Sequence, residues 1–156
     1  MGNWREMVAF PLTGRSKKPR RKGLSMVLDK GLGLGETEDF LDIAGDHVDL
    51  VKLGFGTSAL YPDGILQKKI NLVRRYGVDI YPGGTFLEVA IAQGRLLPFL
   101  QTAKKLGFTA VEVSDGTLFL DLEIRRKAIS LATELGFKVL AEVGKKDPND
   151  RQDCCD

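Results

Sequence analysis

The segment LGFKVLAEVGKK, residues 135–146, decides how this chain folds. Its Gly136 follows a stretch with helical periodicity, and a glycine just past a helix commonly turns the chain into the next element. The residues after Gly136 alternate in character, as expected for a strand whose side chains point to opposite faces. One face is apolar and carries Phe137, Val139, Ala141 and Val143. The other becomes charged toward its C-terminal end and carries Lys138, Leu140, Glu142 and, if the alternation continues through Gly144, Lys146.

The same helix–glycine–strand junction occurs twice more, at residues 76–78 and 106–108, with a spacing close to 30 residues. The runs after these glycines are short and rich in β-forming residues, as buried strands are. The pattern predicts strands near residues 24–29, 47–53, 78–82, 108–114 and 137–143. It predicts helices near residues 36–44, 63–76, 86–106 and 121–135, with the third interrupted around Gly94 or Pro98.

Strictly alternating strands and helices predict a parallel sheet, either doubly wound and open or part of a TIM barrel. An open sheet covered on both sides should be apolar on both faces. Here most strands have one apolar face and one that turns charged at the C-terminal end, which favours a barrel with its chemistry at the top of the lumen. We therefore expect an α/β fold of the TIM (β/α)8-barrel type, incomplete, with about five β/α units.

The composition is that of an ordinary globular protein. The chain has 156 residues, 43% apolar and 28% charged, with a net charge of +2. A basic run precedes the first strand, but no aromatic residues interleave with it, so we expect a flexible solvated arm and no nucleic-acid partner. No apolar run is long enough for a membrane span, and the adjacent Cys154 and Cys155 have no metal-ligand spacing, so we expect a cytoplasmic protein with no membrane partner. The expected organisation is an arm over residues 1–22, a partial barrel over 23–148 and a polar tail over 149–156.

Carboxylates are expected to meet at the C-terminal ends of the strands. Asp29, Glu112 and Glu142 lie at or near the C-terminal ends of three different predicted strands. Carboxylate oxygens with access to water suit Mg²⁺, a hard ion that prefers oxygen ligands. These three residues are the candidate metal ligands.

Lysines accompany the carboxylates, and Lys146, Lys145 and Lys52 are the candidate catalytic residues. A lysine among such groups can act as a general acid or base because burial and nearby positive charge lower its pKa. Lys146 should share the lumen side with Glu142, four residues away, and Lys145 should point the other way.

Two glycine-rich turns are candidate anion sites, because glycines let backbone N–H groups turn toward an oxyanion and hydroxyls add donors. The first turn follows the second strand and offers Gly54, Gly56, Thr57 and Ser58. The second follows the third strand and offers Gly83, Gly84 and Thr85.

Five ordered stretches resemble the phosphosulfolactate synthase family along residues 23–148: LSMVLDKG (24–31), VDLVKLGFGTSAL (48–60), YPGGTFLE (81–88), AVEVSDGT (110–117) and AEVGKKDP (141–148). The resemblance implies a TIM barrel and a Mg²⁺-dependent addition of sulfite to phosphoenolpyruvate, giving (2R)-phospho-3-sulfolactate, a step of coenzyme M biosynthesis. It also implies that Lys146 occupies the position of the family's proposed acid.

The family continues past this chain with the last three strands of the barrel. A truncated gene product, a frameshifted reading and a piece completed by another chain are all consistent with the sequence. Plant relatives are linked to heat-stress tolerance, so the alternatives to the synthase are a related enzyme with another nucleophile or enolate precursor, and a non-catalytic, stress-related or inactive member. Open sheet edges and an exposed lumen predict self-association into a homo-oligomer.

Overall fold

The computed structural model describes residues 4–9, 16–62 and 64–147. Five strands alternate with helices: β1 (Met26–Asp29), β2 (Leu50–Leu53), β3 (Asp79–Pro82), β4 (Ala110–Val113) and β5 (Lys138–Ala141). The α-helices are α1 (Trp4–Met7), α2 (Leu34–Ala44), α3 (Ile65–Arg75), α4 (Gly84–Ala92), α5 (Leu96–Leu106) and α6 (Leu122–Glu134). Two 3₁₀ helices, η1 (Gly45–His47) and η2 (Gly54–Ala59), flank β2.

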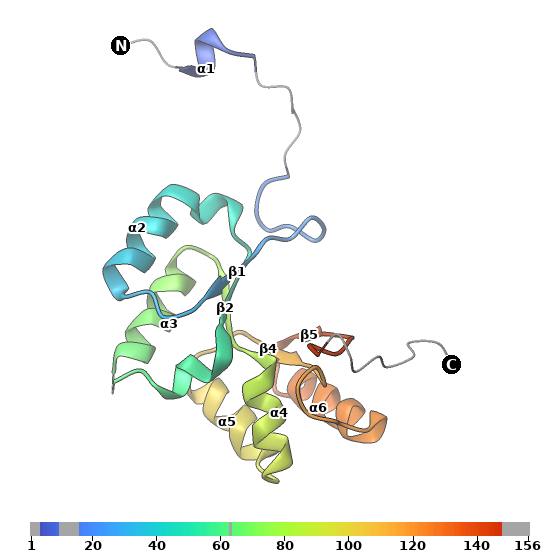
Figure 1. The fold of residues 1–156 in the computed structure, drawn as a ribbon. Helices are drawn as coiled ribbons and strands as arrows, with labels where there is room; N and C mark the ends of the chain where they lie inside the picture. The colour runs from blue at the N-terminus through green and yellow to red at the C-terminus, as the bar shows by residue number, and fades with distance from the viewer. Residues whose placement is uncertain (1–3, 10–15, 63, 148–156) are drawn as a thin grey trace.

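All strand pairs are parallel and follow the order of the chain. One sheet has the order β1-β2-β3 and the other pairs β4 with β5. The two sheets meet where Thr109 N donates to Ile80 O at 3.1 Å and Thr109 Oγ1 accepts from Ile80 N at 3.0 Å. The helices α2 and α3 lie beside β1 and β2, and α5 and α6 lie on the side of β4 and β5 (Figure 1). This sequential parallel order confirms the partial barrel-type fold.

The expected interruption of the third helix is also confirmed. The helix α4 ends at Ala92 and α5 begins at Leu96, with Gly94 between them at a φ of 68°. A positive φ favours glycine because it has no Cβ. Pro98 lies within the first turn of α5, where its missing N–H breaks no helical hydrogen bond.

The core lies between the strands and the helical layer. Its largest cluster combines the outward side chains of the sheet with those of α3 and α5 and includes Val51, Leu53, Ile80, Val111, Ile70, Val73 and Leu100. On the inner face a smaller cluster joins Leu50, Tyr81 and Ala110. Period-2 alternation therefore places an apolar layer from β2 to β5 against the helices, as expected from the sequence, whereas the apolar Met26 and Leu28 of β1 lie on the inner face.

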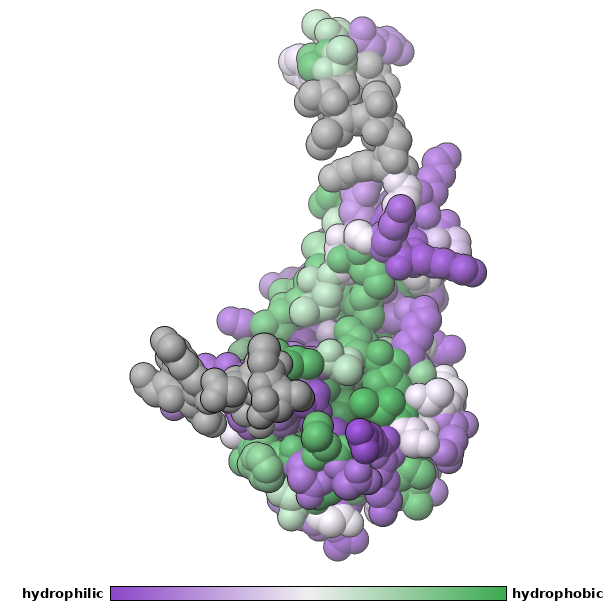
Figure 2. Space-filling view, turned by 90° about the vertical axis from the view of Figure 1, so that its right-hand side faces the viewer, coloured by the Kyte–Doolittle hydropathy of each residue, from purple (hydrophilic) through white to green (hydrophobic). Residues whose placement is uncertain are grey.

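The inner face stays open at β1. Met26 and Leu28 are in register with Leu50 and Lys52, yet they are 47% and 40% exposed. On the face shown in Figure 2, hydrophobic surface extends through the middle of the molecule beside hydrophilic surface. Within the described residues, no strand pairs with the outer edge of β1 or of β5.

The segment before β1 is attached at the N-terminal end of the strands. Arg20 Nε donates to both carboxylate oxygens of Asp49, at 3.0 and 3.1 Å, and its Nη2 donates to Asp46 O at 2.9 Å. Both side chains of this ion pair are only 9% exposed. The expectation of a solvated arm is therefore wrong for Arg20. A charge-assisted hydrogen bond that Nε shares between both carboxylate oxygens of Asp49 compensates for its burial. The domain boundaries themselves stay a prediction.

Candidate active site

Lys52, Glu112 and Glu142 form a charged cluster on the inner face of the strands. They come from β2, from β4 and from the residue after β5. Lys52 Nζ lies 2.7 Å from Glu112 Oε1 and 3.7 Å from Glu142 Oε2. The structure thus brings together three of the residues singled out in the sequence, at the strand ends where (β/α)-barrel enzymes place their active sites.

The first turn of α4 holds the carboxylate of Glu112. Glu112 is 4% exposed, and its Oε1 accepts hydrogen bonds from Lys52 Nζ and, at 3.0 Å, from Gly84 N. A Cβ at Gly84 would lie 2.6 Å from Glu112 Oε1 and 2.3 Å from Ser114 Oγ. Only glycine at this position lets the helix approach the strand so closely.

The two glutamates titrate as a contacting pair. Burial would raise the pKa of Glu112, but hydrogen bonds from Lys52, Glu142 and Gly84 outweigh it and lower that pKa below its usual value. Burial and the contact with Glu112 raise the pKa of Glu142. When one proton is present it therefore resides on Glu142, which donates to the ionised Glu112.

Tyr81 is buried on the inner face next to this pair. Its pKa is raised by burial and by the negative charge of Glu112, so its hydroxyl stays protonated. Sequence reasoning missed Tyr81, which is in register with Lys52. The available signal was period-2 alternation, which places Tyr81 on the same face as the polar Asp79.

Asp29 does not join the cluster, so the structure does not bring the three expected metal ligands together. Asp29 is 2% exposed and forms an ion pair with Lys69 of α3, which is fully buried. Its Oδ1 accepts from Gly31 N and Leu32 N at 2.7 and 2.8 Å.

The physical reason is the register of the sheet. Leu28, and not Asp29, pairs with the inward-pointing Lys52, so Asp29 faces the helical layer together with its partner Leu53. In the described part of the chain, no three His, Cys, Asp or Glu residues are grouped to hold a metal ion.

The two lysines after β5 point to different partners. Lys145 Nζ donates to Asp115 O at 2.7 Å and lies 3.8 Å from the Asp115 carboxylate. Lys146 Nζ donates to Thr85 Oγ1 at 2.5 Å and to Thr117 Oγ1 at 3.3 Å. The positive charge of Lys146 also acts on Glu142, which places the two near each other, whereas Lys145 serves the loop after β4.

The turn after β3 already uses part of its donors. Gly83 N donates to Leu53 O at 2.9 Å, and Gly84 N donates to Glu112. The Thr85 hydroxyl accepts a hydrogen bond from Lys146 Nζ. The proposed anion-binding role of Gly83 and Gly84 therefore stays a prediction, with both amides engaged by the protein itself.

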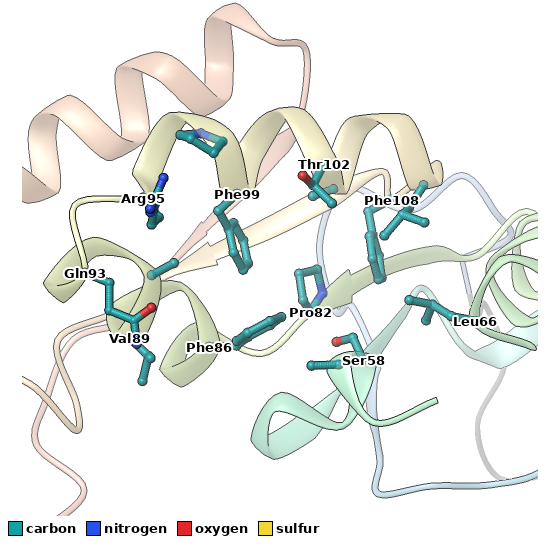
Figure 3. Close-up of a pocket in the computed structure, with 15 residues that line it drawn as sticks. Ser58, Leu66, Pro82, Phe86, Val89, Gln93, Arg95, Phe99, Thr102 and Phe108 are labelled. Atoms are coloured by element: carbon teal, nitrogen blue, oxygen red, sulfur yellow. The ribbon is translucent and has the colours of Figure 1, made fainter. Parts of the chain in front are cut away.

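The turn after β2 forms η2, and its candidate residues Thr57 and Ser58 have different surroundings. Thr57 Oγ1 donates to Gly54 O at 2.8 Å, and Gly56 has a positive φ of 71°. Ser58 is buried and lines an apolar cavity of about 380 Å³ on the helical side, together with Phe86, Phe99 and Phe108 (Figure 3). This cavity is lined by none of the three charged residues, and Ser58 lies outside their cluster.

Sequence reasoning also missed Glu88, a fully buried carboxylate of α4. It accepts from Thr117 N at 3.0 Å, from Leu118 N at 2.7 Å and from Ser114 Oγ at 2.5 Å. The available signal was a glutamate within the apolar run GTFLEVAIA. A helix that is apolar on all sides is buried, and glutamate is rarely buried without a partner.

Fold and site together define a class: a (β/α)-barrel-type protein with lysines and carboxylates gathered at the carboxyl ends of parallel strands. The family model of (2R)-phospho-3-sulfolactate synthase matches residues 13–155. The chain belongs to this enzyme family.

Curated relatives agree with the family model. The chain is 47% identical over 129 residues to the phosphosulfolactate synthase of Methanocaldococcus jannaschii, covering 83% of this chain and 51% of that protein. It is 42% identical over 134 residues to that of Methanothermobacter thermautotrophicus, covering 86% and 52%. The phosphosulfolactate synthase of Bacillus subtilis is 35% identical over 140 residues, covering 89% and 54%. The chain thus spans about half the length of these relatives. Within the described residues, no helix has the length and apolar character needed to cross a membrane.

Proposed function

We propose that this chain supplies catalytic groups for the addition of sulfite to phosphoenolpyruvate, which gives (2R)-phospho-3-sulfolactate. The observation that carries the proposal is the cluster of Lys52, Glu112 and Glu142 beside Lys146, in a member of the phosphosulfolactate synthase family. Small anionic molecules are the proposed partners.

The reaction needs a proton donor and a way to stabilise negative charge. The sulfur lone pair of sulfite forms a bond to the methylene carbon of phosphoenolpyruvate, and the electrons of the carbon–carbon double bond move toward the carboxylate. A proton then forms a bond with the adjacent carbon. Lys146 is the proposed donor, because its ammonium is held at the open end of the strands by two hydroxyls.

Magnesium is the proposed cofactor, with Glu112 and Glu142 as the residues that would hold it. The raised pKa of Glu142 beside the ionised Glu112 indicates two carboxylates whose repulsion a proton or a cation relieves. Mg²⁺ commonly keeps several waters and takes one or two carboxylates in addition to its substrate, so a pair is sufficient. When bound, it would supply stabilisation of the negative charge on the substrate carboxylate.

The remaining groups of the cluster have supporting roles. Lys52 holds Glu112 in place at 2.7 Å and keeps positive charge beside the pair. Tyr81 is buried on the inner face next to Glu112 and packs with Leu50 and Ala110.

The test is a product assay with sulfite and phosphoenolpyruvate. The chain is assayed alone and mixed with the separately produced C-terminal half of the Methanocaldococcus jannaschii relative, with magnesium or with a chelator. Magnesium-dependent formation of phosphosulfolactate that Lys146→Ala abolishes is the expected result. Product formed equally well by Lys146→Ala would refute the assignment of the acid. No product from the mixture, with the two halves shown to associate, would favour a non-catalytic member.

A further inference from the structure

The buried carboxylate of Glu88 takes no part in the chemistry proposed above. It is fully buried on α4, and in the described part of the chain no lysine or arginine forms an ion pair with it. Burying a carboxylate without a cation is costly unless hydrogen bonds satisfy its oxygens. Oε2 receives two backbone amides and Oε1 receives the Ser114 hydroxyl.

All three donors belong to one short segment, residues 114–118, which we call the β4 loop. Two hydrogen bonds to backbone N–H groups fix the path of a loop more firmly than contacts to side chains, because they constrain the main chain directly. Glu88 thus determines where Thr117 lies relative to α4.

The β4 loop in turn contacts Lys146 at both its main chain and its side chain. Lys146 N donates to Gly116 O at 2.9 Å, and Lys146 Nζ lies 3.3 Å from Thr117 Oγ1. The stem of Lys146 passes so close to Gly116 that a Cβ there would lie 3.2 Å from its Cγ and Cε. The Thr117 hydroxyl is also 3.2 Å from the hydroxyl of Thr85, the second partner of the ammonium.

The helix α4 connects the two sides of this arrangement. Thr85 and Glu88 are three residues apart, so they lie on neighbouring positions of one helical face. Thr85 contacts the Lys146 ammonium directly, and Glu88 fixes the loop that brings the other hydroxyl.

We propose that Glu88 is a positioning residue for the Lys146 ammonium. By holding the β4 loop against α4, it brings the hydroxyls of Thr117 and Thr85 together around Nζ. The significance of this for catalysis rests on the proposed function, but the positioning itself does not.

The rate at which the lysine ammonium protons exchange with water measures this positioning, and no substrate is needed. In the 156-residue chain labelled with ¹⁵N at lysine Nζ, a hydrogen-bonded ammonium gives an observable cross-peak, and the peaks of Lys146 and Lys52 are assigned from Lys146→Arg and Lys52→Arg. Glu88→Gln keeps the size of the side chain but places an NH₂ group among N–H donors. It is expected to speed proton exchange at Lys146 about fivefold or more, as the loss of one hydrogen bond of ordinary strength would.

Lys52 is the internal reference, because its carboxylate partners Glu112 and Glu142 lie outside the β4 loop. Its peak should persist in Glu88→Gln, and the exposed control Glu123→Gln on α6 should leave both peaks unchanged. If Glu88→Gln does not fold, Glu88→Asp decides, since its shorter side chain cannot reach both amides. An unchanged Lys146 peak, or equal loss of the Lys52 and Lys146 peaks in a folded variant, would overturn the proposal.

The outcome is separable from that of the proposed function. If Lys146 responds to Glu88 as expected while Lys146→Ala retains product formation, Glu88 positions a lysine that is not the acid. In that case the inference holds and the assignment of the acid fails.

Discussion

At the scale of the residue, two adjacent lysines have different surroundings and therefore different tolerance to substitution. Lys146→Arg is expected to lower turnover about 100-fold or more in the complemented assay, because a guanidinium hardly gives up a proton and cannot serve as an acid. Lys145→Arg should retain most activity, because an arginine can still pair with Asp115. Equal losses in the two variants would contradict the assignment.

Glu142 and Glu112 should respond to neutralisation with opposite sign. A carboxyl with a raised pKa contributes stability that is present below the unfolded value of about 4.3 and is lost as the pH rises through its folded pKa. Glu142→Gln is therefore expected to be more stable than the parent chain at neutral pH and equal to it in acid. Urea unfolding across a pH series measures the difference.

The pKa of Glu112 is lowered, so its charge stabilises the fold above the unfolded pKa, and this stability disappears as the pH falls through the folded value. Glu112→Gln should lower the free energy of unfolding by about 1–3 kcal/mol at neutral pH, because Lys52 loses its nearer partner. In strong acid the substitution should not change it. A gain in stability from Glu112→Gln at neutral pH would refute this account of the pair.

At the scale of the element, the fit of α4 against β4 depends on a single missing methyl group. Gly84→Ala would place a Cβ at 2.3 Å from Ser114 Oγ and 2.6 Å from Glu112 Oε1, so these buried side chains or the helix must shift. The expected cost is about 1–3 kcal/mol in the free energy of unfolding, as for other overpacked sites.

The matched control is Gly35→Ala in α2, where a new Cβ would meet nothing within 4 Å. Alanine is the better helix former by about 0.5–1 kcal/mol, so this variant should be at least as stable as the parent. Comparable destabilisation by both substitutions would show that helix propensity, and not contact with Ser114 and Glu112, governs Gly84.

At the scale of the whole molecule, the open inner face at β1 predicts self-association. Leu28 is an apolar side chain on that face and is 40% exposed. Leu28→Lys should shift sedimentation of the chain toward the monomer, because a charge on an exposed edge strand opposes pairing with another chain.

Ile43 supplies the control, since it is 86% exposed but lies on α2, away from the inner face. Ile43→Lys should leave sedimentation unchanged. A parent chain that sediments as a monomer and melts in one sharp transition would refute the expectation of self-association.

The sequence by itself determined the five strands, the longer helices between them, their order and the two faces of most strands. These follow from local periodicities: glycine junctions at near 30-residue spacing end the helices, and period-2 alternation separates apolar from charged positions. The pairing of Lys52 with Glu112 and Glu142 was predictable for the same reason, because carboxyl ends of parallel strands meet at one edge.

Only the tertiary structure decided which partner each buried charge finds. Asp29 lies at the correct strand end, yet the register with β2 turns it toward Lys69, a residue 40 positions away on α3. Glu88 finds its donors in a loop that no local pattern places beside α4. Such contacts depend on how helices pack on the sheet, and this packing is set by side-chain volumes along the whole chain rather than by local sequence.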